Sequence, residues 1–161
     1  MVEGNGKRAE APVRWPYGIR KRHVELLQVV LDREDRTPVH ESLGLVQSSA
    51  KNLISGINQV FGGDKSRIDG VALAIVFGIK HGLLNTENIP DIGEVELKGR
   101  DAEILALMMR GFRTSFIAYR LSLSPRTVQN YERDMCRRLG LKNKYRAVAA
   151  GLKVLQEAGV I

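Results

Sequence analysis

The sequence predicts an all-α protein built from two tandem four-helix units, and three observations support this prediction. Apolar residues recur at spacings of three and four in residues 18–85 and again in residues 97–161. Helix boundaries are marked by residues suited to them, such as Ser124-Pro125 at a start and Gly111 at an end. The two stretches also align on each other with a shift of 78 positions.

The composition favours a compact protein in a reducing compartment. The chain is 43% hydrophobic and 27% charged, and its single cysteine excludes an internal disulfide framework. No secretory signal is visible, and the apolar run 71–79 is too short to span a bilayer. We therefore expect a cytoplasmic, nucleoid-associated protein that does not contact membranes.

The positive charge is concentrated in two parts of the chain. Residues 97–161 carry thirteen basic and five acidic side chains, and residues 1–22 carry six and two. Residues 23–85 are nearly neutral and residues 86–96 are purely acidic in charge. A polyanion is the expected partner of the basic parts.

Residues 1–17 are rich in glycine, proline, alanine and charge, which predicts a flexible basic arm. Basic side chains in and just after this arm are suited to a minor groove or to phosphates, although a solubilising tail is an equal alternative. They are Lys7, Arg8, Arg14, Arg20, Lys21 and Arg22.

The first four-helix unit spans residues 18–85, and its last helix is predicted over residues 68–84. Residues 71–77 of this helix are apolar on every side, so it needs a partner on both faces. That partner is a fourth helix at residues 146–155, either from the same chain, as an intrachain pseudo-dimer, or from a second chain, as a homodimer. The expected interface residues are Val71, Ile75, Val148 and Leu152.

Residues 86–96 are predicted to be an acidic linker, because Pro90 and Gly93 interrupt helical structure there. We interpret this segment as solvated, with shielding of the basic unit as the alternative.

The second unit, residues 97–161, begins with a helix over residues 100–110 that ends at Gly111. Thr114 is suited to cap a short helix over residues 115–121. A tight turn leads to the third helix, which Ser124 caps, and Asn143 caps a fourth helix that runs to Gly159. Two short helices joined by a small turn form a helix-turn-helix.

The third helix, residues 125–139, has the two faces that a helix needs in a DNA groove. Val128, Tyr131, Met135 and Leu139 form an apolar stripe. Arginine meets phosphates or guanine edges, and asparagine and glutamine pair with adenine edges. Such side chains make up the opposite face: Arg126, Gln129, Asn130, Arg133 and Arg137.

About 65 C-terminal residues closely resemble the LuxR-type (GerE-like, FixJ/NarL-like) DNA-binding domain. The residues that carry the resemblance are the segment 97–105, Gly111, Ile117-Ala118, Leu121, the segment 124–128, Arg138-Leu139-Gly140-Leu141 and Asn143-Lys144. The resemblance implies that the third helix enters the major groove and that the fourth helix often mediates dimerisation. The chain departs from the family pattern at Lys98, Gln129 and Tyr131.

The resemblance also implies roles for individual residues. The base and groove contacts are expected at Arg126, Gln129, Asn130 and Arg133, with Arg137 on the same face. The phosphate contacts are expected at Thr127, Arg138, Asn143, Lys144 and Arg146.

The shift of 78 positions predicts that the first unit is a divergent copy of the second, with a chance likeness of two amphipathic helical stretches as the alternative. Arg22, Glu25 and Leu27 fall on Arg100, Glu103 and Leu105, and Asn52 falls on Asn130. Residues 47–61 are the equivalent of the third helix of the second unit. They lack the arginines of that helix and contain one basic residue, so their contacts with DNA are expected to be weak. The residues suited to such contacts are Gln47, Ser48, Lys51 and Asn52.

Enzyme chemistry finds little support in the sequence. His23, His40 and His81 are scattered, and Cys136 has no second thiol with which to bind metal or cycle redox state. There is no Gly-rich phosphate loop and no zinc-ligand spacing, so we expect no catalytic residue, no cofactor and no metal.

Three functions remain open at this point. The first is a sequence-specific, DNA-binding transcriptional regulator without a sensor domain, controlled by its own level or by a partner, as in bacterial, phage or mobile-element regulators. The second is a partner-binding module that contacts an activator, RNA polymerase or another regulator. The third is an architectural or recombination-associated DNA binder. Two recognition helices in one chain would contact double-stranded DNA at half-sites roughly 34 Å apart.

Overall fold

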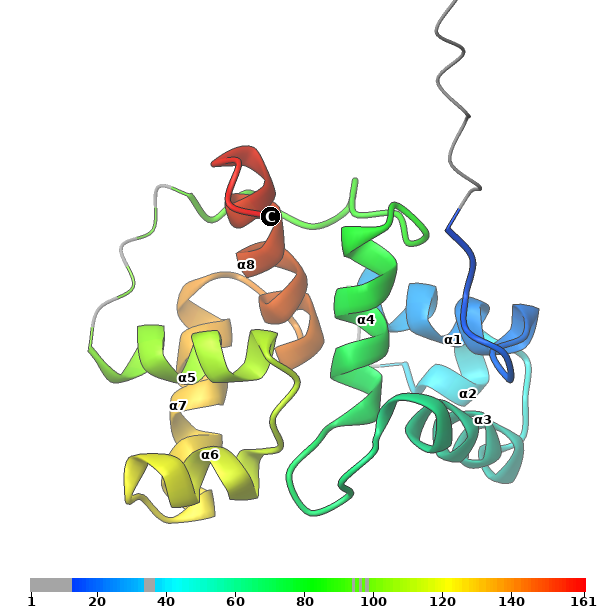
Figure 1. The fold of residues 1–161 in the computed structure, drawn as a ribbon, viewed down its shortest axis with the longest axis horizontal. Coiled ribbons are helices and arrows are strands. Elements are labelled where there is room, and N and C mark those ends of the chain that lie inside the picture. The colour runs from blue at the N-terminus through cyan, green and yellow to red at the C-terminus, as the bar shows by residue number, and fades with distance from the viewer. Residues whose placement is uncertain (1–12, 34–36, 94, 96, 98) are drawn as a thin grey trace, which may run out of the picture.

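The computed structural model describes residues 13–33, 37–93, 95, 97 and 99–161. Within these residues the chain forms eight helices and no strand, which confirms the all-α prediction. Figure 1 shows α1 to α3 on one side and α5 to α7 on the other, with α4 and α8 between them. The helices are α1 Lys21–Asp32, α2 Val39–Ser42, α3 Gln47–Phe61, α4 Gly70–Lys80, α5 Arg100–Met109, α6 Thr114–Leu121, α7 Pro125–Arg138 and α8 Lys144–Glu157. No helix in these described ranges combines the length and apolarity that a membrane span requires.

The helix boundaries of residues 99–161 follow from local signals. The Ser124 hydroxyl accepts a hydrogen bond from the Thr127 backbone N–H at 3.1 Å, and Pro125 occupies the first position of α7. The Asn143 side chain caps α8 by accepting from the Arg146 N–H at 2.9 Å. Gly111, with φ of +80°, ends α5 as expected.

Thr114 is not the cap of α6, contrary to the sequence-based expectation. Arg113 is the N-cap residue, and Thr114 lies in the first turn of α6. The Thr114 hydroxyl instead donates to Glu132 Oε1 at 2.9 Å. The hydroxyl therefore ties α6 to α7, and the tertiary contact replaces the local cap.

The N-terminal helices are held by a cap and by an aromatic cluster that the sequence reading missed. Asp69 caps α4 by accepting from the backbone N–H groups of Val71 and Ala72. Trp15 packs against Phe61 and Phe77, with ring centroids 6.4 and 5.6 Å away. The arm predicted to reach residue 17 therefore ends earlier, because Trp15 belongs to the folded unit. Residues 1–12, with Lys7 and Arg8, lie outside the described residues.

The segment expected to be a solvated linker is partly buried. The side chains of Ile89 and Ile92 are only 2% and 6% exposed and belong to the hydrophobic core. Lys153 Nζ on α8 also donates to the Ile89 carbonyl at 3.2 Å. Burial of the two isoleucines holds this acidic segment against the helices, so the linker prediction was wrong on this point.

The apolar helix α4 packs on α8 of the same chain, as the same-chain alternative predicted (Figure 1). The four expected interface residues, Val71, Ile75, Val148 and Leu152, are all buried. Gln156 on α8 also donates to the Ile79 carbonyl at 3.3 Å. The buried residues of both halves form one hydrophobic cluster, so the second face of α4 is covered without a second chain.

Candidate nucleic-acid interface

The helix α7 presents one buried and one exposed face, as its sequence predicts. Val128 and Met135 are fully buried, Leu139 is buried and Tyr131 is partly buried. The opposite face combines cationic groups with amide side chains that can pair with base edges. Its exposed members are Arg126, Gln129, Asn130, Arg133 and Arg137.

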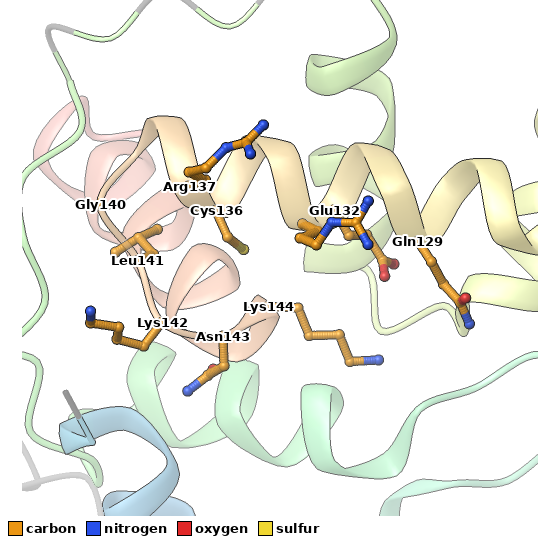
Figure 2. Close-up of a pocket in the computed structure, with 10 residues that line it drawn as sticks. Gln129, Glu132, Cys136, Arg137, Gly140, Leu141, Lys142, Asn143 and Lys144 are labelled. Carbon is orange, nitrogen blue, oxygen red and sulfur yellow. The ribbon is translucent and has the colours of Figure 1, made fainter. Parts of the chain in front are cut away.

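A basic groove of about 690 Å³ runs beside α7. Figure 2 shows Gln129 and Glu132 on α7, with Lys142 and Lys144 across the groove on the turn into α8 and at its start. Arg133 and Arg137 also line it. The groove therefore places four cationic side chains around a surface suited to a phosphate backbone. The sequence analysis did not predict Lys142 as a contact, although it directly precedes the predicted contacts Asn143 and Lys144.

Short polar contacts orient the arginines of α7. Arg133 donates to the Asn130 side-chain oxygen at 2.9 Å, and Arg137 pairs with Asp134 at 3.0 Å. These contacts lie on the surface, where an ion pair contributes only about 0–1 kcal/mol, so DNA can displace them at little cost. Arg138 pairs with Asp101 at the start of α5 and remains half exposed.

Lys144 is held by the N-terminal half of the chain. Its ammonium lies 3.1 Å from Asp69 Oδ2, the same oxygen that accepts a hydrogen bond from the Tyr145 hydroxyl at 3.0 Å. Burial, followed by the nearby Asp69 carboxylate, raises the pKa of Tyr145, so this hydroxyl stays protonated and donates. A third of the Lys144 side chain remains exposed, and this residue lines the groove beside α7.

Arg146 does not occupy the position of a phosphate contact, and its predicted role requires correction. Its side chain is 3% exposed, and its guanidinium donates to the carbonyls of Leu31, Arg33 and Asn88. The expected role of Asn143 is also limited, because its amide oxygen caps α8 and its nitrogen donates to the Val30 carbonyl at 3.0 Å. Both side chains join α8 to the end of α1, where they supply donors to the carbonyls of Val30 and Leu31.

Glu132 is a buried carboxyl on α7 that the sequence reading also missed. It is 8% exposed, and burial raises its pKa while the hydrogen bond from Thr114 opposes that rise. The only sequence signal was its position four residues after the buried Val128, beside the apolar stripe. Its carboxyl connects α7 to α6 and faces the cation of Lys144.

Comparison with known proteins agrees with this arrangement. Residues 96–150 match the family described as bacterial regulatory proteins, luxR family. These residues form a LuxR-type helix-turn-helix domain. No curated protein and no solved structure is similar enough to the chain to count as a match.

The LuxR-type domain, with its basic, exposed α7, makes this chain a DNA-binding protein of the transcription-regulator class. Two of the three histidines have structural roles. His23 Nδ1 accepts from the Arg20 N–H at the start of α1, and His81 packs on Phe77 with ring centroids 4.6 Å apart. Among the residues that the structure describes, no group of His, Cys, Asp and Glu is arranged to hold a metal ion.

Cys136 of the LuxR-type domain is expected to be an unreactive thiol. Burial, together with the neighbouring Glu132 carboxylate, raises the pKa of Cys136 to about 11. The thiolate fraction at pH 8 is then roughly 100-fold below that of an ordinary thiol, so modification of the native protein should be slow. We expect a thiol-reactive dye to label the native protein far more slowly than the urea-unfolded protein.

The same pKa shift fixes the sign of a pH dependence. The pKa of Cys136 is higher in the folded than in the unfolded chain, so its contribution to stability is present at neutral pH. That contribution is lost as the pH rises from about 9 to 11. Replacing Cys136 with serine should remove this part of the alkaline loss, and rapid labelling of the native protein at pH 8 would show that the thiol is not protected.

Proposed function

We propose that the protein is a sequence-specific transcriptional regulator that places α7 in the major groove of double-stranded DNA. The single observation that carries this proposal is the composition of the exposed face of α7 within the LuxR-type domain. In this arrangement Gln129, Asn130 and Arg133 contact base edges, whereas Thr127, Arg138 and Lys144 contact phosphates. The protein acts in the cytoplasm, at the nucleoid.

We further propose that the first unit is a divergent copy of the second. The helix positions support this. Moving α5, α6 and α7 back by 78 positions gives residues 22–31, 36–43 and 47–60, and the observed α1, α2 and α3 cover 21–32, 39–42 and 47–61. Moving α8 back by 77 positions gives 67–80, and α4 covers 70–80.

The contacts between the two units favour an intrachain pseudo-dimer. In a two-fold interface, each contact between one residue pair recurs with the partners exchanged. The Asp69 backbone N–H donates to the Gly111 carbonyl at 2.8 Å, after the end of α5. The equivalent of Asp69 is Arg146, whose side chain donates to the carbonyl of Arg33, the equivalent of Gly111. The donor is backbone in one case and side chain in the other, but the fourth helix of each unit begins at the end of the other unit's first helix.

The exposed face of α3 supports two reading helices in one chain. Positions 48, 51, 52, 55 and 59 of α3 are exposed, as are their equivalents 126, 129, 130, 133 and 137 on α7. The α3 face has lost the arginines, so we propose that α7 supplies most of the specificity. The operator is then a non-palindromic site in two parts, with a strong and a weak half.

Selection of bound sequences from random duplex DNA tests this function. We expect one enriched motif in two unequal parts whose centres are separated by about one helical turn. A palindromic motif would mean that only α7 reads DNA and that two chains assemble on it. If no sequence is enriched, the specific-regulator proposal fails, and an architectural or partner-binding role becomes the better explanation.

A further inference from the structure

The first unit contains a second basic groove, beside α3. It has a volume of about 300 Å³, and the charged side chains that line it, within the described part of the chain, are the cationic Lys51, Lys65 and Arg113. Lys51 and Lys65 are exposed. Arg113 comes from the LuxR-type domain and is anchored by a 2.6 Å hydrogen bond from its Nε to the Ile68 carbonyl.

This groove occupies positions equivalent to the groove beside α7. With the 78-position shift, most of the α3 groove falls on residues that line the α7 groove. The matched pairs are Lys51 and Gln129, Ile54 and Glu132, Ser55 and Arg133, Asn58 and Cys136, Gln59 and Arg137, Gly62 and Gly140, and Lys65 and Asn143. The positive charge lies at different positions in the two grooves. The α7 groove has Arg133 and Arg137, whereas the α3 groove has Ser55 and Gln59 at those positions and carries its charge on Lys51 and Lys65.

The two grooves are joined across the boundary between the units. A third groove, of about 350 Å³, shares Ile54, Asn58 and Arg113 with the α3 groove. It shares Lys144 with the α7 groove. The three grooves therefore adjoin one another, from α7 past Lys144 and Arg113 to α3, and we call this row of grooves the channel.

The acidic groups along this channel are already engaged. Asp69 caps α4 and pairs with Lys144. Glu132 is buried and accepts from Thr114. Among the described residues, no carboxylate lines the groove at the α3 end beside these cations, so their field points to an anionic ligand.

We propose that this channel holds the sugar-phosphate backbone of a DNA duplex beyond the site read by α7, and that Lys51 and Lys65 neutralise phosphates there. The contact is with phosphate, and it does not depend on base sequence. The proposal rests on the proposed function, because α7 must first fix the duplex in register. A single chain then covers two half-sites, a strong one read by α7 and a weak one at α3 in which Lys51 and Lys65 add backbone contacts.

The test compares two duplexes that carry the same selected α7 half-site. The short duplex ends just beyond that half-site, and the long duplex continues by a further helical turn of arbitrary sequence toward α3. Wild-type protein should bind the long duplex several-fold more tightly. The double variant Lys51→Gln/Lys65→Gln should lose this gain and should bind the short duplex as wild type does. On the long duplex, the slope of log affinity against log salt should fall by about 1 for each lysine removed.

Lys80→Gln provides the matched control. Lys80 is exposed in the last turn of α4 and lines none of the three grooves, and its replacement removes one positive charge. This variant should keep the full gain from the longer duplex. An unchanged gain in the double variant would overturn the channel proposal while leaving the specific-regulator proposal intact. Absence of binding to either duplex by wild-type protein would instead be a failure of the proposed function.

Discussion

Replacing Arg133 with alanine is expected to weaken binding to the selected duplex by about 1–3 kcal/mol and to relax the preference at one base position. Arg133 projects from the exposed face of α7, with 71% of its side chain accessible. Its hydrogen bond to Asn130 keeps the guanidinium beside a second side chain that can read a base edge. Affinity should be measured on the selected motif and on a shuffled sequence, since only loss of discrimination identifies a base contact.

Arg110→Ala is the control for net charge. Arg110 is exposed at the end of α5 and is not part of α7, but its removal changes the charge by the same amount. We expect this variant to weaken binding slightly and equally on both sequences. If Arg133→Ala also lowers affinity equally on both, Arg133 contacts phosphate only, and the assignment of base reading to this residue is wrong.

Replacing Arg146 with alanine should lower the free energy of unfolding by about 2–4 kcal/mol, because three backbone carbonyls lose their donor and a cavity forms in the core. Those carbonyls belong to Leu31, Arg33 and Asn88, so the loss falls where α8 meets the first unit and the buried linker. Urea unfolding measures the effect directly. Arg146→Lys should recover only part of it, since an ammonium does not reproduce the guanidinium fork.

The outcome for Arg110→Ala sets the scale for this second prediction. The Arg110 guanidinium lies over the Phe112 ring at 5.5 Å, an exposed cation–π contact that contributes about 0.5–1 kcal/mol, so Arg110→Ala should change stability by no more than about 1 kcal/mol. If Arg146→Ala stays within the same limit while DNA binding is lost, Arg146 would be a phosphate contact after all, as the family resemblance implied.

Local signals explain why the helices of the LuxR-type domain could be predicted from the sequence. The Ser124-Pro125 start and the Gly111 stop of these helices depend only on neighbouring residues. The bounds of α3 were also predicted correctly, because α3 aligns with α7 when the sequence is shifted by 78 positions.

The corrected predictions all depend on contacts between distant parts of the chain. Arg146 is buried because the end of α1 lies against α8, more than a hundred positions away in the sequence. Trp15 leaves the predicted arm because Phe61 and Phe77 provide an aromatic surface for it. In the linker, the isolated apolar residues Ile89 and Ile92 were a usable signal, but the surrounding acidic residues outweighed it in a composition-based interpretation.

The exposed residues of α7 could be chosen from the sequence because helical periodicity separates them from the core. The grooves could not be predicted from helical periodicity. Their walls combine α3, the start of α6 and the start of α8, which only the packed structure brings together. Arg113 and Lys65 carried no local signal that set them apart from other surface cations.

The central claim is that one chain supplies both units that face the DNA, and the number of chains bound per duplex tests it most directly. Native mass spectrometry of the protein with the selected duplex gives this number. We predict one chain on each two-part site, with α4 packed on α8 of the same molecule. Two chains on one site would contradict the intrachain pseudo-dimer and would show that each chain contributes a single reading helix.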